Sequence, residues 1–214
     1  MHPPAQPIRL YRMAISGHCH RVELFLSLLG LPYETVEMDL RTGCQKQPDF
    51  LAKNVFGQVP VIEDGEVTLA DSNAILVYLA SRYAPGRWLP SDPAGAARVQ
   101  RWLSVAAGPL AFGAAAARVI QLFGRPDDPV PAQLRAQQLL NVMEQELARR
   151  PFLAGDAPTL ADLANYSYVA HAPEGNVSLE PYPAVRGWLA RIETLPGFVP
   201  MVRSPVGLQA PVAA

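Results

Sequence analysis

The chain has 214 residues, half of them apolar, and carries 18 basic against 19 acidic residues. Because the charges nearly cancel and no basic patch or acidic tail stands out, neither nucleic acid nor an anionic membrane is expected as a partner, and no apolar run looks long enough to span a bilayer. Only two cysteines are present, Cys19 and Cys44, so we expect no disulfide framework and a reducing, cytoplasmic setting.

The first part of the chain alternates strand and helix patterns. Residues 8–13 alternate in character as a strand does, and from Cys19 the apolar residues recur at helical spacing until Gly30. A second strand is predicted over residues 33–38 and a short helix over residues 48–54. Strand, helix and strand in this order favour a parallel pairing of the two strands.

Residues 57–72 predict a β-hairpin that runs into a helix. Two β-branched runs, 59–62 and 67–70, flank an Asp64-Gly65 turn, which is a strong short-range hairpin signal.

Two features make this hairpin unusual. Pro60 lies near the head of the first strand, where it cannot donate to a ladder, so a special backbone geometry such as a cis Val59-Pro60 bond is expected. Asp71-Ser72 then opens a helix that runs to about residue 82, with Ser72 as its predicted N-cap.

The rest of the chain shows only helical patterns. A long helix over residues 99–123 is predicted to kink at Gly108-Pro109, and another runs over residues 129–147. Thr159 and Asp162 have the spacing of a capping box at the start of a third helix, and a last helix covers residues 185–192.

The predicted architecture is therefore an α/β domain followed by an all-α helical domain. The α/β part has the order βαβαββα over residues 1–83, a Pro-rich linker covers residues 84–92, and the helical domain covers residues 93–214.

Several segments resemble one known family. SGHCHRVELFLSLLGLPYETVEMDL, PDFLAKNVFGQVPVIEDG and LADSNAILVYLA look like the thioredoxin-like N-terminal domain of cytosolic glutathione S-transferases, with features of its bacterial, theta-like, beta-like and nu-like members. APTLADLANYSYVAHA and PYPAVRGWLARIETLPGF are similar to the helical domain of that family. The resemblance runs from about Ile8 to Met201.

The resemblance implies a glutathione site in the hairpin. Val59, before a cis Pro60, would pair its backbone with the cysteinyl part of glutathione, while Asp71 and Ser72 would hold the γ-glutamyl end. A helix N-terminus suits a carboxylate because it offers free amides and a positive dipole end. Gln58 would lie toward the glycine carboxylate, with Lys53 and Gln45 as weaker candidates.

The sulfur site has two candidates, Ser16 and Cys19. Theta-like and zeta-like relatives use a serine at the position of Ser16 to donate to the thiolate, whereas beta-like relatives place a cysteine close to Cys19. A helix-terminal cysteine can have a lowered pKa and form a mixed disulfide with glutathione, or it can be a small buried residue. We favour Ser16. His18, where relatives often carry Asn, is expected to share the sulfur contact, to act as a proton acceptor near neutral pH, or else to be a turn residue that faces solvent.

The function implied is a glutathione transferase that activates the thiolate for attack on a small apolar electrophile in detoxification. A glutathione-dependent disulfide reductase or peroxidase is the alternative, and a non-catalytic binding protein is a third. Departures at His18 and Glu23, the latter next to a retained base at Arg21, keep the third alternative open. Maleylacetoacetate isomerase is disfavoured because His18 replaces the cysteine of its signature.

The resemblance also implies where the electrophile binds and that the chain pairs with a second copy of itself. The electrophile would lie between the domains, against residues 99–123, with Phe112, Tyr166 and His171 as candidate contacts. A homodimer is implied, in which the first domain of one subunit faces the helical domain of the other. Glutathione is the only cosubstrate expected. No metal is expected, because His18, Cys19 and His20 are consecutive and do not converge on one ion.

Overall fold

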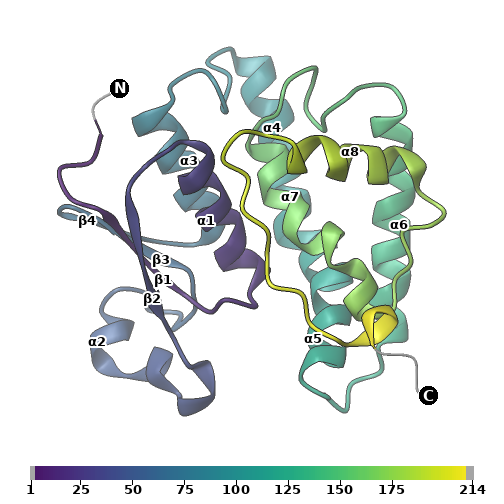
Figure 1. Ribbon diagram of the computed structural model, residues 1–214, viewed down its shortest axis with the longest axis horizontal. Helices are drawn as coiled ribbons and strands as arrows, with labels where there is room; N and C mark the ends of the chain where they lie inside the picture. Colours follow the sequence, from purple (N-terminus) through teal and green to yellow (C-terminus); the bar gives the residue numbers. More distant parts are fainter. Residues whose placement is uncertain (1–2, 211–214) are drawn as a thin grey trace.

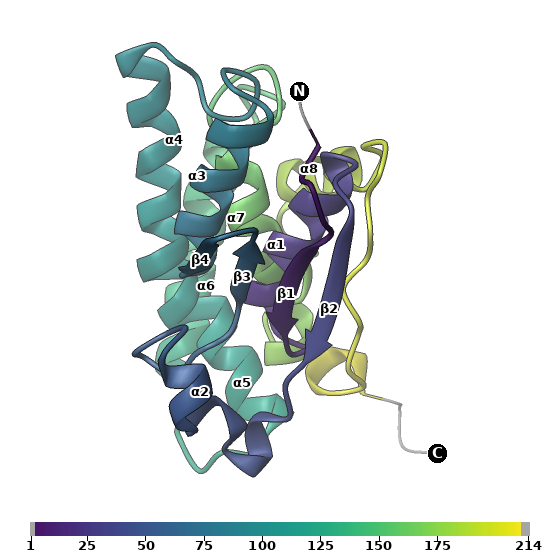
Figure 2. The same cartoon turned by 90° about the vertical axis from the view of Figure 1, so that its left-hand side faces the viewer.

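The first part of the chain folds as a four-stranded mixed sheet in the order β2-β1-β3-β4 (Figures 1 and 2). The structure is a computed structural model that describes residues 3–210, so the outermost residues of both predicted domains lie outside it. β1 and β2 are parallel, as predicted, and β3 is antiparallel to both of its neighbours. The strands are β1 (Ile8–Arg12), β2 (Tyr33–Glu37), β3 (Val61–Asp64) and β4 (Val67–Ala70).

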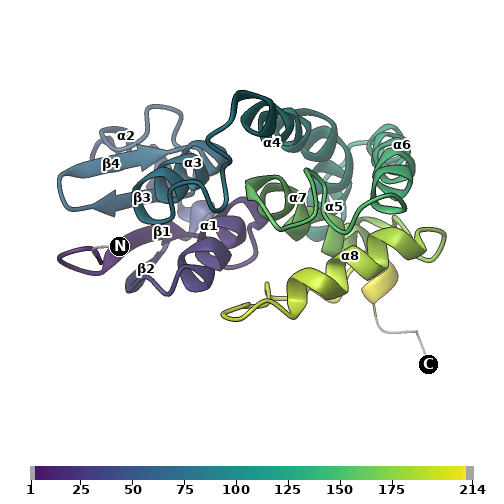
Figure 3. The same cartoon turned by 90° about the horizontal axis from the view of Figure 1, so that it is seen from above.

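Helices cover both faces of this sheet. Ile8 and Leu10 alternate with the exposed Arg9 and the half-buried Tyr11 in β1. They are fully buried on the face covered by α1 (Gly17–Leu28) and α3 (Ser72–Tyr83). Tyr11 points the other way, and its ring meets Phe50 of the short helix α2 (Pro48–Leu51) at 6.0 Å. α1 lies between the sheet and the helical domain (Figure 3).

The hairpin turn lies one residue later than predicted. Asp64 is the last residue of β3, paired with Val67, and the turn is Gly65-Glu66 with Gly65 at a φ of +60°. Asp64 belongs to the strand because its buried carboxylate accepts hydrogen bonds from Tyr78 and Tyr83 at 2.7 and 2.6 Å. Gly65 can take the left-handed conformation that the turn requires.

The second part of the described chain is helical. The predicted long helix is continuous from residue 93 to residue 122, and its middle is a π-helical segment. The elements are α4 (Pro93–Val105), the π-helical segment (Ala106–Ala115), α5 (Ala116–Leu122), α6 (Val130–Leu147), α7 (Leu160–Ala170) and α8 (Pro183–Glu193).

The π-helical segment stands where a kink was predicted. Pro109 lies inside it and has no N–H, so the ordinary hydrogen-bond ladder is interrupted there. Just beyond, Gly113 approaches α6 so closely that an added Cβ would lie 2.9 Å from the backbone nitrogen of Ala136. The small residues around Gly113 thus serve close helix packing.

By length and composition alone, the helix Pro93–Leu122 could cross a membrane, contrary to the expectation from the sequence. In the fold it contacts α7 and α6, and 44% of its most apolar window is buried. Its apolar character is accounted for by these contacts within the helical domain.

α7 is the centre of the helical domain, and all residues from Leu160 to Val169 are buried. The predicted capping box is present: Thr159 Oγ1 accepts from Ala161, while Asp162 accepts from the Thr159 amide at 2.8 Å. Asp162 also accepts from the indole of Trp188 in α8 at 2.9 Å. The cap therefore joins α7 to α8 as well as starting the helix.

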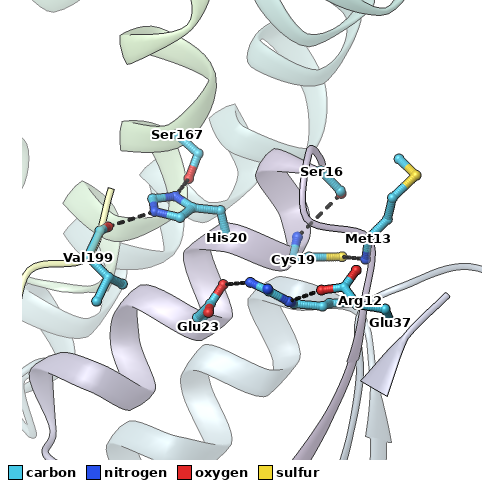
Figure 4. Close-up of polar contacts among 9 residues, drawn as sticks. All are labelled: Arg12, Met13, Ser16, Cys19, His20, Glu23, Glu37, Ser167 and Val199. Atoms are coloured by element: carbon cyan, nitrogen blue, oxygen red, sulfur yellow. Dashed lines mark hydrogen bonds and ion pairs between the residues drawn. The ribbon is translucent and has the colours of Figure 1, made fainter. Parts of the chain in front are cut away.

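The last part of the described chain returns to the first helix. Ser27 donates to the carbonyl of Gly197 at 2.7 Å, and His20 lies 2.9 Å from both Val199 O and Ser167 Oγ (Figure 4). Burial lowers the pKa of His20 to about 4, so its neutral ring donates from Nε2 to Val199 and accepts from Ser167. Residues near both ends of the chain thus share one interface.

Candidate functional site

A hollow of about 760 Å³ is lined by four segments of the first domain. They are the turn between β1 and α1, the stretch between β2 and α2 that holds Leu40 and Gln45, the loop between α2 and β3, and the junction of β4 and α3. All of the predicted glutathione contacts line it, and so do two of the three predicted sulfur-site residues. The lining residues that were predicted are Ser16, His18, Gln45, Lys53, Gln58, Val59, Pro60, Asp71 and Ser72.

Ser16 places its hydroxyl at the N-terminus of α1. It is the N-cap of the helix, in extended conformation, and its Oγ accepts from the amide of Cys19 at 3.4 Å (Figure 4). Accepting this bond leaves the hydroxyl hydrogen available to donate. A donor and the positive end of a helix dipole are therefore present at one point of the hollow.

Cys19 lies one helical turn further in and does not line the hollow. Its side chain is 1% exposed, and its Sγ accepts from the amide of Met13 at 3.5 Å (Figure 4). Burial raises the pKa of the Cys19 thiol to about 11, so the group is a protonated thiol at neutral pH. A thiol in this state is a poor nucleophile.

Alkylation should separate the two cysteines. In the native protein near pH 8 we expect iodoacetamide to modify the half-buried Cys44 and to spare Cys19, because only a reachable thiolate reacts at a useful rate. Mass spectrometry of the peptides, with and without denaturant, measures this. Modification of Cys19 before Cys44 in the folded protein would contradict its burial.

His18 faces the hollow with a neutral ring. Burial, and secondarily the charge of Arg21, lowers the pKa of His18 to about 3. The ring packs edge-on against Tyr168 at 5.0 Å, and its Nδ1 lies 3.4 Å from Ser72 Oγ. His18 therefore lines the hollow, and with so low a pKa its ring does not take up a proton near neutral pH.

Val59 presents unpaired backbone to the hollow. The Val59-Pro60 bond is cis, as predicted. Among the described residues, neither the N–H nor the C=O of Val59 forms a hydrogen bond. The preceding loop is held in place by Asn54, whose Nδ2 donates to the carbonyl of Gln58 at 2.8 Å. A free backbone donor and acceptor in one residue can pair with a peptide-like ligand.

Asp71, not Ser72, is the N-cap of α3. Its Oδ1 accepts from the amides of Asn73 and Ala74, both at 2.9 Å, whereas Ser72 already belongs to the helix. Asp71 has a φ of 69°, which is rare for a residue other than glycine and is tolerated mainly at functional positions. The other carboxylate oxygen, Oδ2, has no hydrogen-bond partner in the described part of the chain and can accept from a ligand.

The three predicted electrophile contacts lie elsewhere. Tyr166 is buried and donates to Glu193 at 2.9 Å, and His171 is buried with its Nδ1 2.6 Å from Glu174. Phe112 is 63% exposed and lines a separate hollow between α4, the π-helical segment and α6. Helical spacing showed that these residues share helices, but it did not show which face each one takes.

A hollow of about 410 Å³ beside the β1–α1 turn lies between the domains, at the end of the range 99–123 expected from the sequence, but its individual residues were not predicted. Its apolar lining comes from Met13, Ile15, Met38 and Phe123, so it lies between the first domain and the end of α5. Glu37, Asp39 and Arg41 add a polar rim. These residues are distant in sequence, and no local pattern links them.

Glu23, which departs in sign from the relatives, forms an ion pair with Arg12 of β1, and Arg12 also binds Glu37 at 2.6 Å (Figure 4). The acidic residue is thus balanced within the first domain. Among residues 3–210, no group of three or more His, Cys, Asp and Glu side chains is placed to hold a metal ion.

Comparison with known proteins gives a consistent result. Residues 6–81 match the glutathione S-transferase N-terminal domain, and residues 125–196 match the glutathione S-transferase C-terminal domain. Glutathione S-transferase 3 of Zea mays is 40% identical over 209 residues, which cover 90% of this chain and 91% of the relative.

Solved structures agree in fold. A glutathione S-transferase from Pseudomonas fluorescens superposes with a TM-score of 0.87 at 36% identity, covering 92% of this chain and all of that one. A glutathione transferase homologue from Drosophila mojavensis, solved with bound glutathione, has a TM-score of 0.81 at 28% identity and covers 89% of each chain.

Proposed function

Because this chain belongs to the glutathione S-transferase family and is a glutathione transferase, we propose that Ser16 is the residue that stabilises the glutathione thiolate. The observation that carries this proposal is the position of its hydroxyl, which lies in the hollow at the N-terminus of α1. Cys19 is buried behind it, so disulfide exchange through that thiol finds no support.

We propose that glutathione lies along the hollow with its γ-glutamyl end at α3. Its ammonium would meet Asp71, and its carboxylate would meet the hydroxyl and the amide of Ser72, because Asp71 already binds the amides of Asn73 and Ala74. The cysteinyl part would pair with the backbone of Val59. Gln58 is exposed at the far end and suits the glycine carboxylate, whereas Lys53 already pairs with Glu63.

The chemistry then follows from the position of the sulfur. A free thiol is mostly protonated at neutral pH, and its thiolate is the nucleophile. The Ser16 hydroxyl and the α1 dipole stabilise negative sulfur, so the thiol loses its proton to water more readily. The thiolate attacks an electrophilic carbon, forms a carbon–sulfur bond and expels the leaving group with its electron pair.

The electrophile is proposed to occupy the hollow lined by Met13, Ile15, Met38 and Phe123. This hollow adjoins Ser16 through the β1–α1 turn, and its apolar lining suits a small apolar substrate. Phe112, Tyr166 and His171 have no place in this arrangement.

Steady-state kinetics with glutathione and chlorodinitrobenzene test the proposal. Ser16→Ala should lose conjugation, and Cys19→Ala should retain it because the buried thiol touches neither substrate. Equal conjugation by both variants and the unchanged protein would refute the assignment of Ser16.

We also propose that the protein is a homodimer. Val55 and Phe56 are 79% and 74% exposed on the first domain, while an apolar hollow of about 770 Å³ opens on α4, the π-helical segment and α6. Phe56 of each copy inserted into the hollow of the other would bury both surfaces, with the same contact repeated by two-fold symmetry.

Phe56→Ser should therefore shift the protein from dimer to monomer. Each lost contact removes the burial of a phenyl ring, roughly 1.5 kcal/mol or more. Sedimentation velocity at micromolar concentration measures the change. Leu208→Ser is the matched control, because Leu208 is 56% exposed on a different part of the molecule. Sedimentation of the unchanged protein as a monomer would contradict the dimer.

Cytoplasmic location and a role in detoxification complete the proposal. Both cysteines are free, which suits a reducing compartment. An open apolar hollow beside the reactive sulfur suits conjugation of varied small electrophiles.

A further inference from the structure

Arg21 lies directly behind the part of the site that is assigned to the γ-glutamyl group. It comes from the second turn of α1 and is 1% exposed. Its Nη1 donates to Ser72 Oγ at 3.3 Å and to Asn73 Oδ1 at 2.9 Å, so one nitrogen spans the first two residues of α3. Ser72 lines the hollow, and Arg21 does not.

The other two nitrogens of the Arg21 guanidinium, Nε and Nη2, are buried and unpaired among the described residues. Burial lowers the pKa of Arg21 to about 10, and the group is still charged at neutral pH. A buried, incompletely paired charge costs stability, and an apolar side chain of similar size would be tolerated as well or better.

A second buried arginine shows the contrast. Arg118 is also 1% exposed, but all three of its nitrogens have partners, including Glu174 at 2.7 Å and the carbonyl of Ile15 at 2.8 Å. The contacts of Arg118 within the fold therefore explain why a charged side chain is buried there. The contacts of Arg21 do not.

The direction of the hydrogen bond between Arg21 and Ser72 indicates what Arg21 does. A guanidinium can only donate, so Ser72 Oγ must accept from it. The single hydroxyl hydrogen of Ser72 then points elsewhere, and the other polar atom recorded near it is His18 Nδ1 at 3.4 Å. An incoming carboxylate would be a stronger acceptor than this neutral ring. Arg21 therefore sets Ser72 as a donor toward the hollow.

We propose that Arg21 is a positioning residue for glutathione binding: it fixes Ser72 as a donor to the γ-glutamyl carboxylate and supplies the positive charge behind it. This inference rests on the proposed placement of the γ-glutamyl group at Ser72. Asp71, which is exposed at the same helix start, carries a negative charge that would repel a carboxylate. Arg21 supplies a positive charge that offsets it.

The test compares four full-length proteins: the unchanged chain, Arg21→Met, Ser72→Ala and the double variant. Glutathione affinity is measured by isothermal titration calorimetry, KM and kcat with chlorodinitrobenzene, and the unfolding temperature without ligand. Ser72→Ala should weaken glutathione binding about tenfold, the value of one hydrogen bond to a charged group. Arg21→Met should approach the same loss, seen in the KM for glutathione more than in kcat.

Two results would support a positioning role specifically. The double variant should bind glutathione within about twofold of Ser72→Ala, because residues that act through one contact are not additive. The unfolding temperature of Arg21→Met should equal or exceed that of the unchanged chain, whereas Arg118→Met, as the control for a paired buried arginine, should lower it.

The proposal is overturned if Arg21→Met leaves the glutathione affinity unchanged, lowers the unfolding temperature, or weakens binding equally with and without Ser72. Failure of the underlying placement looks different: Ser72→Ala would then bind glutathione as well as the unchanged chain does. Arg21→Lys adds a check, because it keeps the charge with a shorter reach and should bind between the two extremes.

Discussion

Replacing Ser16 with alanine should lower kcat for conjugation by about 10²- to 10³-fold, the cost of removing one donor from developing negative charge in a preorganised site. The hydroxyl stabilises the charged sulfur and contributes little to binding the rest of glutathione, so the KM for glutathione should change much less. The ultraviolet absorbance of the bound thiolate can be measured as a function of pH. It should show that the pKa of the bound glutathione thiol is higher in the variant than in the unchanged protein.

Two matched variants separate donation from helix capping. Ser16 also caps α1, and losing that bond costs about 1 kcal/mol of stability. Ser16→Asp keeps an acceptor for the Cys19 amide but cannot donate when ionised, so it should fold and stay inactive. Ser16→Thr keeps the hydroxyl and should recover activity. An active Ser16→Asp would show that capping, not donation, is the role of this residue.

Replacing Arg118 with methionine should lower the free energy of unfolding by about 3–5 kcal/mol, because it leaves a carboxylate buried without its cation. Glu174 is 1% exposed, and among residues 3–210 its partners besides Arg118 are His171 and the amide of Ser204, at 2.6 and 3.1 Å. Urea unfolding followed by circular dichroism measures the loss.

The double variant Arg118→Met with Glu174→Gln provides the control. Removing the charge of Glu174 as well should restore part of the lost stability, because no uncompensated ion then remains in the interior. If the double variant is less stable than Arg118→Met by the full cost of both changes, the pair does not behave as a buried ion pair.

The fold could be predicted because its signals are local and repeated. Helical periodicity in α1 and α7 and alternation in β1 each fixed an element within a few residues. The errors came where a tertiary contact decided the outcome. Asp64 was assigned to a turn because Asp-Gly is a good turn pair, but Tyr78 and Tyr83 hold its carboxylate in the sheet.

The hollow that we assign to glutathione could be predicted in large part from the hairpin, because residues 53–72 supply most of its lining and lie close in the chain. For the hollow that we propose for the electrophile, the sequence could indicate only a position between the domains, because Met13, Met38 and Phe123 meet only after the two domains have packed. The role proposed for Arg21 could not be predicted either. It depends on two guanidinium nitrogens that have no hydrogen-bond partner among the described residues, and no sequence pattern indicates such an unpaired group.

The contact between the two ends of the chain has a consequence for biosynthesis. α1 is made early, yet His20 and Ser27 find their partners at Val199 and Gly197. On the ribosome, these contacts cannot form until nearly the whole chain has emerged. The first domain therefore completes its packing only after the last segment has been synthesised. Helix α1, which Ser16 caps, is therefore among the first parts of the chain to be translated and among the last to complete its contacts.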